Sequence, residues 1–144
     1  TVHPGCLCGE TTLVARQLAD YIDRTAPPGI HIWGGETSVN LPARHGTGGR
    51  NQQLALQVAQ RLAGNDGFCF LSAGTDGIDG HSEDAGAIVD GGTMMRGEAE
   101  GLDIEDALAR ADANPFLAAS GDLIHLGATG TNVMDIMLAW KAGS

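Results

Sequence analysis

The chain has 144 residues, a formal net charge of −10 and only 8 Lys or Arg residues. This length fits one domain, and a hydrophobic content of 42% is enough to build a core. The scarcity of positive charge argues against a nucleic-acid-binding surface. No apolar run is long enough to span a membrane and no signal peptide is present, so we expect a cytoplasmic protein. Because the first residue is Thr1, we expect a piece of a longer polypeptide.

The first half of the chain predicts two amphipathic helices and two short strands. One helix covers about residues 10–25, where apolar side chains recur on one face until Pro27 and Pro28 end it. Strands over residues 30–33 and 37–41 would be joined at Gly34 and Gly35 as a hairpin or a bend. A second helix begins near Arg50.

The second half alternates in the same way. A buried strand over residues 68–71 and a short strand over 87–89 precede helices near 93–101, 103–111 and 115–121. Residues 123–126 form a further strand, and 133–140 a final strand or helix. This alternation predicts an α/β layered fold with a mostly parallel or mixed sheet flanked by helices.

A glycine-rich loop opens directly into the second helix. Its residues Gly48, Gly49, Arg50 and Asn51 would place free N–H groups, the helix dipole and a guanidinium beside a bound anion. The alternative is a tight loop with a surface arginine. The loop is neither a Walker loop nor a dinucleotide fingerprint, because it lacks the lysine of the first and the third glycine of the second.

Two carboxylates follow the buried strand in another glycine-rich turn. Asp76 and Asp79 are three residues apart, at the edge of the sheet where ligands bind in open α/β folds. Carboxylate oxygens suit a hard cation such as Mg²⁺. Aspartate also caps turns through its own backbone, and spacing alone favours neither reading.

Polar groups gather in two more turns. Thr129, Thr131 and Asn132 offer hydroxyl, amide and backbone N–H groups that can hold an anion. Asp135 begins an apolar segment, where an unpaired carboxylate is costly, so it either faces a site or caps the turn. Glu36 is either a ligand or an exposed turn residue.

Five ordered motifs resemble the MOFRL domain, the C-terminal domain of the glycerate 2-kinase family, whose members also carry the label hydroxypyruvate reductase. The motifs are Gly34-Gly35-Glu36-Thr37-Ser38-Val39, Gly48-Gly49-Arg50-Asn51-Gln52-Gln53-Leu54-Ala55-Leu56, Ala73-Gly74-Thr75-Asp76-Gly77-Ile78-Asp79-Gly80, Ala85-Gly86-Ala87 and Gly127-Ala128-Thr129-Gly130-Thr131-Asn132-Val133. The resemblance covers nearly the whole chain. Departures include Gln53 in place of a common glutamate and Met134 in place of a common asparagine.

The resemblance implies a single domain over residues 1–144 that lacks a larger N-terminal partner domain. In the family, ATP with Mg²⁺ phosphorylates the 2-hydroxyl of D-glycerate, giving 2-phosphoglycerate, in the cleft between the two domains. The resemblance also implies that Arg50 contacts the glycerate carboxylate or a phosphate. Asp76 and Asp79 would lie near the metal or the substrate hydroxyl. The other matching polar residues would bind substrate or phosphate: Glu36, Gly48, Gly49, Asn51, Thr129, Thr131, Asn132 and Asp135.

Three functions remain open at this stage. The first is half of a kinase cleft, which we expect to be inactive alone because the resemblance implies an essential lysine in the absent domain. The second is a hydroxypyruvate reductase, although these residues contain no dinucleotide fingerprint. The third is a non-catalytic binding or regulatory module. We also expect an apolar face, left bare without the partner domain, that could pair two copies into a homodimer.

Overall fold

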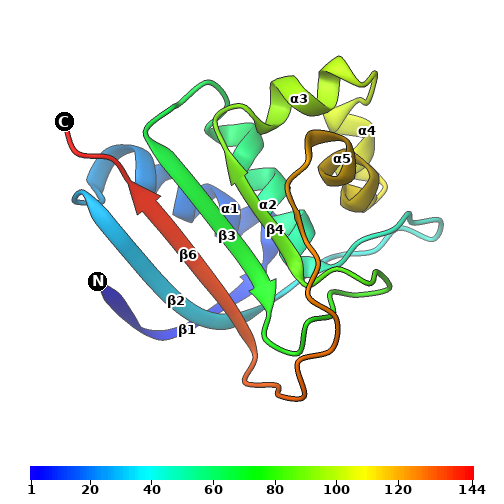
Figure 1. The fold of residues 1–144 in the computed structure, drawn as a ribbon, viewed down its shortest axis with the longest axis horizontal. Helices are drawn as coiled ribbons and strands as arrows, with labels where there is room; N and C mark the ends of the chain where they lie inside the picture. The colour runs from blue at the N-terminus through cyan, green and yellow to red at the C-terminus, as the bar shows by residue number, and fades with distance from the viewer.

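In the computed structural model, which describes all 144 residues, six strands form one sheet in the order β1-β2-β6-β3-β4-β5 (Figure 1). The strands are β1 (Val2–Glu10), β2 (Gly29–Ser38), β3 (Phe68–Gly74), β4 (Gly86–Asp90), β5 (Leu123–Ile124) and β6 (Asp135–Lys141). β1 and β2 are parallel, and every other neighbouring pair is antiparallel. The predicted α/β fold is confirmed and the sheet is mixed. The alternative of a mostly parallel sheet was wrong, because β6 runs antiparallel between β2 and β3.

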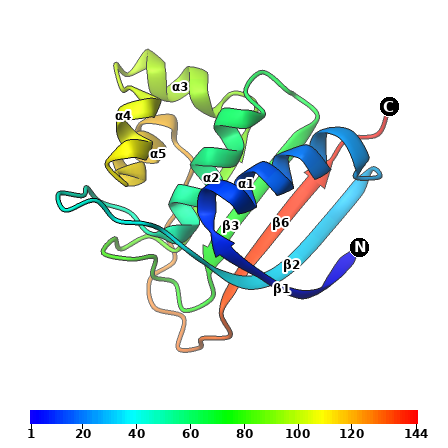
Figure 2. The same cartoon turned by 180° about the vertical axis from the view of Figure 1, so that it is seen from behind.

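The helices are α1 (Thr11–Asp20), α2 (Arg50–Arg61), α3 (Thr93–Ala99), α4 (Ile104–Ala109) and α5 (Ala113–Ser120). A single π-helical turn, η1 (Tyr21–Thr25), extends α1. Figure 2 shows α1 and α2 lying across one face of the sheet, while α3 to α5 gather at its side beyond β4 and contact one another and α2. None of these helices has the length and apolar character needed to cross a bilayer.

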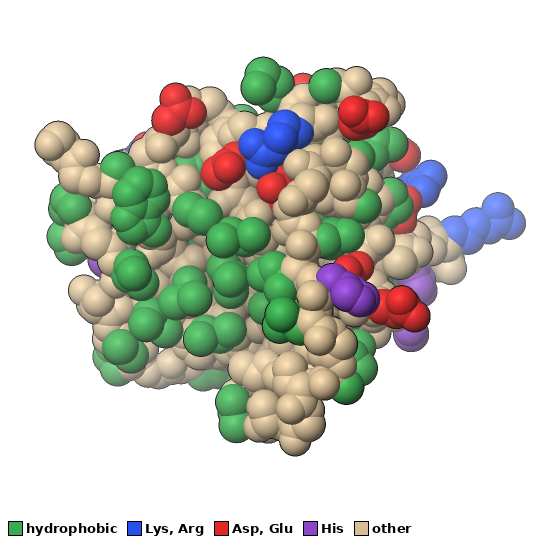
Figure 3. All heavy atoms as spheres, viewed as in Figure 1, with side chains coloured by type: hydrophobic (Ala, Val, Ile, Leu, Met, Phe, Trp, Pro, Cys, Tyr) green, Lys and Arg blue, Asp and Glu red, His purple; other side chains and the backbone are tan.

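Alternating residues of the central strands build the core between the sheet and the helices. Phe70 of β3 and Met137 of β6 are fully buried and point toward α1 and α2. Leu54 and Val58, four residues apart on α2, pack against them in the same cluster. The opposite face of the sheet has no helix over it, and Figure 3 shows apolar side chains gathered there.

Two regions differ from the sequence-based expectation. Gly34 and Gly35 do not turn the chain, because β2 runs straight through them. A Cβ on Gly35 would lie 2.1 Å from the carbonyl oxygen of Leu7, so the missing side chain lets β1 approach closely. The final apolar segment, expected as a strand or a helix, is the strand β6, and Val2–Glu10 form the edge strand β1, where no element was expected.

Candidate functional site at one edge of the sheet

Three neighbouring strands bring the candidate residues to one edge of the sheet. Asp135, the first residue of β6, is in register with Gly35 of β2 and with Gly74 of β3. Glu36 is the next residue of β2, and the loop that carries Asp76 and Asp79 begins directly after Gly74. Residues 100 positions apart in the chain therefore share one small region, because β6 lies between β2 and β3.

Arg50 is the central charged group of this edge. It begins α2, and its Nε and Nη2 donate to the two oxygens of Asp135 at 2.6 and 3.1 Å. Its Nη1 lies 3.1 Å from Glu36. The side chain of Asp135 is only 2% exposed, whereas those of Arg50 and Glu36 are 38% and 53% exposed. The Asp135 hydrogen bonds raise the pKa of Arg50, although its burial acts in the opposite direction.

Asp79 caps α2 from a distant part of the chain. Its two carboxylate oxygens accept hydrogen bonds from the backbone N–H groups of Asn51 and Gln52, at 3.1 and 2.9 Å. The N-cap position of the helix is Gly49, which has no side chain to do this. Asp79 is 2% exposed, and burial raises its pKa even though these hydrogen bonds favour the charged form.

Asn51 ties this cap to the sheet. Its side-chain amide donates to Asp79 at 3.2 Å and its oxygen accepts from the hydroxyl of Ser72 at 2.7 Å. A Cβ on Gly49 would lie 2.4 Å from the Asp79 carboxyl carbon, so only glycine allows this approach. The start of α2 is thus held by buried, fully partnered polar groups, and Arg50 projects from that fixed base.

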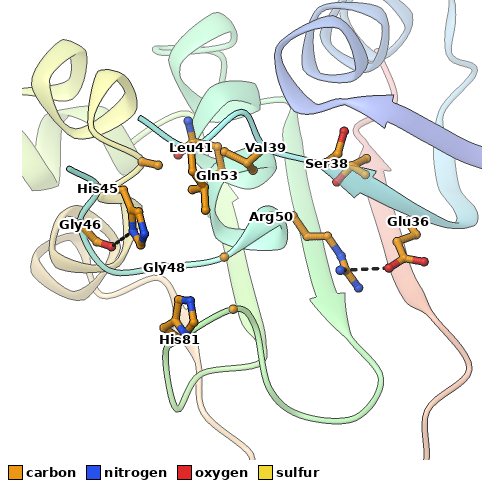
Figure 4. A pocket seen from close by; sticks show the side chains of 14 residues that line it. Glu36, Ser38, Val39, Leu41, His45, Gly46, Gly48, Arg50, Gln53 and His81 are labelled. Carbon is orange, nitrogen blue, oxygen red and sulfur yellow. Dashed lines mark hydrogen bonds and ion pairs between the residues drawn. The ribbon is translucent and has the colours of Figure 1, made fainter. Parts of the chain in front are cut away.

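A pocket of about 370 Å³ opens beside the start of α2 (Figure 4). Of the residues expected from the sequence, it is lined by Glu36, Gly48, Gly49 and Arg50. Asn51 and Asp79 lie buried beneath these residues, and Asp135 backs the guanidinium. The loop-to-helix junction and the buried acid of β6 therefore contribute to one site.

The other expected residues lie outside the pocket lining, on the loops at the same edge. Asp76 accepts a hydrogen bond from the N–H of Ile78 at 3.0 Å, the local turn geometry that aspartate favours. The hydroxyl of Thr129 donates to the carbonyl of Thr75 at 2.6 Å, which joins the two loops. Thr131 and Asn132 are exposed at the tip.

The geometry around the two aspartates gives no support to a metal site formed by this chain alone. No group of three or more His, Cys, Asp or Glu side chains is arranged to hold a metal ion. Both oxygens of Asp79 face N–H donors, which a bound cation would have to replace. Magnesium ligation by Asp76 and Asp79 alone is therefore unsupported by the geometry.

Three residues that the sequence analysis did not place in the site also line the pocket: His45, Gln53 and His81. The rings of His45 and His81 stack with centroids 6.1 Å apart. The two histidines are 36 positions apart and no local pattern links them. Gln53 could have been found, because it follows Arg50 by one helical turn.

Comparisons with known proteins identify the family. The model of the MOFRL family matches residues 29–135. The chain belongs to the MOFRL family. It is 46% identical over 111 residues to a D-glycerate 2-kinase of Thermotoga maritima, covering 77% of this chain and 26% of that protein. It is 44% identical over 110 residues to an Agrobacterium vitis protein with a hydroxypyruvate reductase name, covering 76% and 29%.

The fold has also been solved in a relative. A crystal structure of glycerate kinase from Thermotoga maritima superposes with a TM-score of 0.90 at 38% identity, covering 99% of this chain and 36% of that one. The chain thus spans about a quarter to a third of the length of these relatives. Glycerate kinase names among close relatives indicate that this MOFRL domain is of the glycerate kinase type.

Proposed function

We propose that this chain is one domain of a cytoplasmic glycerate 2-kinase and supplies one wall of its active site. The whole enzyme would transfer the terminal phosphoryl group of ATP to the 2-hydroxyl of D-glycerate. The observation that carries the proposal is the guanidinium of Arg50, held by a buried carboxylate at the mouth of a pocket beside a helix N-terminus.

Arg50 can bind an anion because its orientation is already fixed. A guanidinium has five N–H donors, and Asp135 uses two of them. The Nη1 group faces Glu36, whose exposed carboxylate an incoming carboxylate or phosphate can replace. Asp135 is buried and stays in place. The guanidinium, which lies beside the positive end of the α2 dipole, then stabilises an anion in a chain whose net charge is −10.

We assign the remaining residues by their place at this edge. Asp79 and Asn51 act as positioning residues, since they hold the start of α2 and touch no open space. Asp76, which is half-buried on its loop, is the candidate for approaching the substrate hydroxyl or the magnesium that accompanies ATP. Thr129, Thr131, Asn132 and the amides of Gly48 and Gly49 would line the cleft toward the second domain.

One wall is not a complete kinase site. Phosphoryl transfer depends on positioning and on neutralising the negative charge of the transferred group. At this edge Arg50 is the positive group, and three carboxylates lie near it: Glu36, Asp79 and Asp135. We therefore propose that the isolated chain releases no ADP from ATP and D-glycerate. The second domain would supply further positive charge.

A chimera tests the proposal directly. This chain replaces the matching segment of the Thermotoga maritima enzyme, with which it shares its fold. ADP release is measured with ATP, Mg²⁺ and D-glycerate. We expect activity from the chimera and none from the 144-residue chain or from the truncated enzyme alone. A folded chimera without activity, with an active parent, would instead favour a non-catalytic module.

The same chimera separates kinase from reductase. Oxidation of NADH or NADPH in the presence of hydroxypyruvate would favour the function in the name of the Agrobacterium vitis relative. We expect no such oxidation.

A further inference from the structure

Two buried side-chain oxygens in the wall of the pocket have no hydrogen-bond partner within the chain. They are Oγ1 of Thr37 and Oε1 of Gln53, whose residues are 3% and 5% exposed. Both residues line the pocket that Arg50 and Glu36 also line, and Figure 4 shows Gln53 among these side chains. An unpaired buried polar atom is costly, and native proteins keep few of them without a reason.

The fold directs both side chains to this place. Thr37 follows Glu36 on β2, and successive side chains of a strand point to opposite faces. Thr37 therefore shares the helix-covered face of the sheet with the buried His31, whereas Glu36 is exposed. Gln53 follows Arg50 by one turn of α2. The two unpaired oxygens thus lie in the layer between the sheet and α2, at the edge that carries Arg50.

The contacts of Gln53 fix which of its atoms is unpaired. Its Nε2 donates a hydrogen bond to the carbonyl oxygen of Leu108 at 3.2 Å. Turning the amide over would place Oε1 against that carbonyl, and two acceptors do not bond. Oε1 of Gln53 is therefore an acceptor that lacks a donor. The hydroxyl of Thr37 can donate and accept, and it is not bonded to Gln53.

A hydroxyl group is the ligand group that matches both atoms. It can donate to Oε1 of Gln53 and accept from the Thr37 hydroxyl. A carboxylate or phosphate oxygen only accepts, and an ammonium group only donates, so each leaves one of the two atoms unpaired. The pocket therefore combines a positive group for an anion, Arg50, with a neutral pair suited to a hydroxyl.

We propose that Thr37 and Gln53 bind the substrate hydroxyl that is not phosphorylated, and so select a dihydroxy acid over a monohydroxy acid. This inference rests on the proposed function, in which the 2-hydroxyl of D-glycerate reacts and the 3-hydroxyl remains. The carboxylate would bind Arg50. A site that hydrogen-bonds a substrate hydroxyl rejects the analogue that lacks it, because its buried polar groups then stay unpaired.

The test compares two substrates in the active chimera. D-Lactate differs from D-glycerate only by lacking the 3-hydroxyl, and ADP release gives kcat/KM for each. We expect the chimera to prefer D-glycerate by at least about a hundredfold. Thr37→Val removes the hydroxyl but keeps the branched shape, and Gln53→Met removes the amide. Each should lower the preference by roughly tenfold, mainly through a loss of kcat/KM for D-glycerate.

Gln57→Met is the matched control. Gln57 lies one turn further along α2, and its Oε1 is also buried and unpaired, but it does not line this pocket. We expect its substitution to leave the preference unchanged. Thr37→Val should also keep or raise the melting temperature of the 144-residue chain, because it removes an unpaired buried hydroxyl. A purely structural hydroxyl would give a lower melting temperature and an unchanged preference.

An active chimera that does not prefer D-glycerate would overturn the proposal. So would a preference that survives both Thr37→Val and Gln53→Met. If Thr37→Val lowers the melting temperature of the chimera but not that of the 144-residue chain, the second domain supplies the partner of this hydroxyl, and the proposal is also wrong.

A chimera that phosphorylates neither acid would contradict the proposed function, and a binding measurement then decides on the hydroxyl site. The 144-residue chain is titrated with D-glycerate and with D-lactate while its NMR spectrum is recorded. D-Glycerate should shift the Thr37 methyl and the Gln53 side-chain amide resonances, and D-lactate should not. Equal shifts with both acids, or no shift with D-glycerate, would overturn the assignment of these residues.

Discussion

The site edge and the open face of the sheet are built from the same strands, but their side chains differ. The edge holds buried polar groups that bond within the chain, and the open face carries apolar groups that no helix covers. At the edge, Asp79, Asn51 and Asp135 are buried polar groups, and each has its hydrogen-bond partners within the chain. On the open face, Ile88 is 44% exposed and Leu138 is half-buried, and no helix lies over either of them.

Buried polar groups need their hydrogen-bond partners when the domain folds, because an unpaired buried polar group is costly. An exposed apolar face does not carry this cost. The groups that hold the start of α2 are thus satisfied within the domain, although the buried side-chain oxygens of Thr37 and Gln53 in the pocket lining have no partner. The apolar face of the sheet, by contrast, has no helix over it.

The largest expected effect is at the edge. In the active chimera, Arg50→Ala should lower kcat/KM for D-glycerate by on the order of a hundredfold to a thousandfold, as loss of a fixed donor to a charged group does. Arg50→Lys keeps the charge but loses the planar fork, so we expect an intermediate loss. Steady-state ADP release measures both. If Arg50→Ala keeps full activity with a normal melting temperature, Arg50 does not contact substrate.

Asp79→Ala should destabilise the isolated domain by about 3 kcal/mol, because it uncaps α2 and leaves buried N–H groups without an acceptor. Urea unfolding measures the change. Asp79→Asn keeps one acceptor oxygen and should cost less. Equal stability of Asp79→Ala and wild type would show that the cap is not needed and that the edge is less complete than we describe.

The same residue gives a pH test. Burial raises the pKa of Asp79 above its ordinary 3.8, so ionisation is harder in the folded state. Its contribution to stability is therefore full below pH 3.8 and falls as the pH rises through the folded-state pKa. Asp79→Asn should remove this fall, and urea unfolding of both proteins across that range compares them. If the free energy of unfolding changes with pH in the same way in wild type and Asp79→Asn, the pKa of Asp79 is not raised in the folded state.

Met134→Gly should stabilise the domain by about 1 kcal/mol. Met134 has φ of +74°, a left-handed conformation that costs a side chain of its kind roughly 1–3 kcal/mol. The matched control is Met95→Gly in α3, which should lose about 1 kcal/mol of stability. Thermal unfolding measures both changes. A loss of stability in Met134→Gly would mean that its side chain packs usefully at the site edge.

The smallest expected effect concerns Glu36. If an anionic substrate replaces its carboxylate beside Arg50, Glu36→Gln should lower the KM for D-glycerate in the chimera by roughly 2–5-fold, as expected for an exposed ion pair. The exposed carboxylate of Glu98 offers a control, and Glu98→Gln should leave KM unchanged. A higher KM in Glu36→Gln would show that Glu36 binds the substrate directly.

Much of the local structure could be predicted from the sequence. The apolar spacing of Leu54 and Val58 gave α2, and the apolar run from Phe68 gave β3, because both patterns depend only on near neighbours. The glycine-rich turns before α2 and after β3 lie at the same edge of the sheet, and the assignment of a site to them stays a prediction. The resemblance to the MOFRL domain, carried by the same turns, was confirmed.

The sequence alone determined which segments become helices, strands and glycine turns, and which polar residues accompany the turns. Only the tertiary structure decided that β6 runs between β2 and β3, which brings Asp135 to Arg50 across 85 residues. It also decided that Asp79 caps α2 and that one face of the sheet stays uncovered. Local patterns depend on the spacing of neighbours along the chain, whereas these outcomes depend on which distant groups meet when the layers pack.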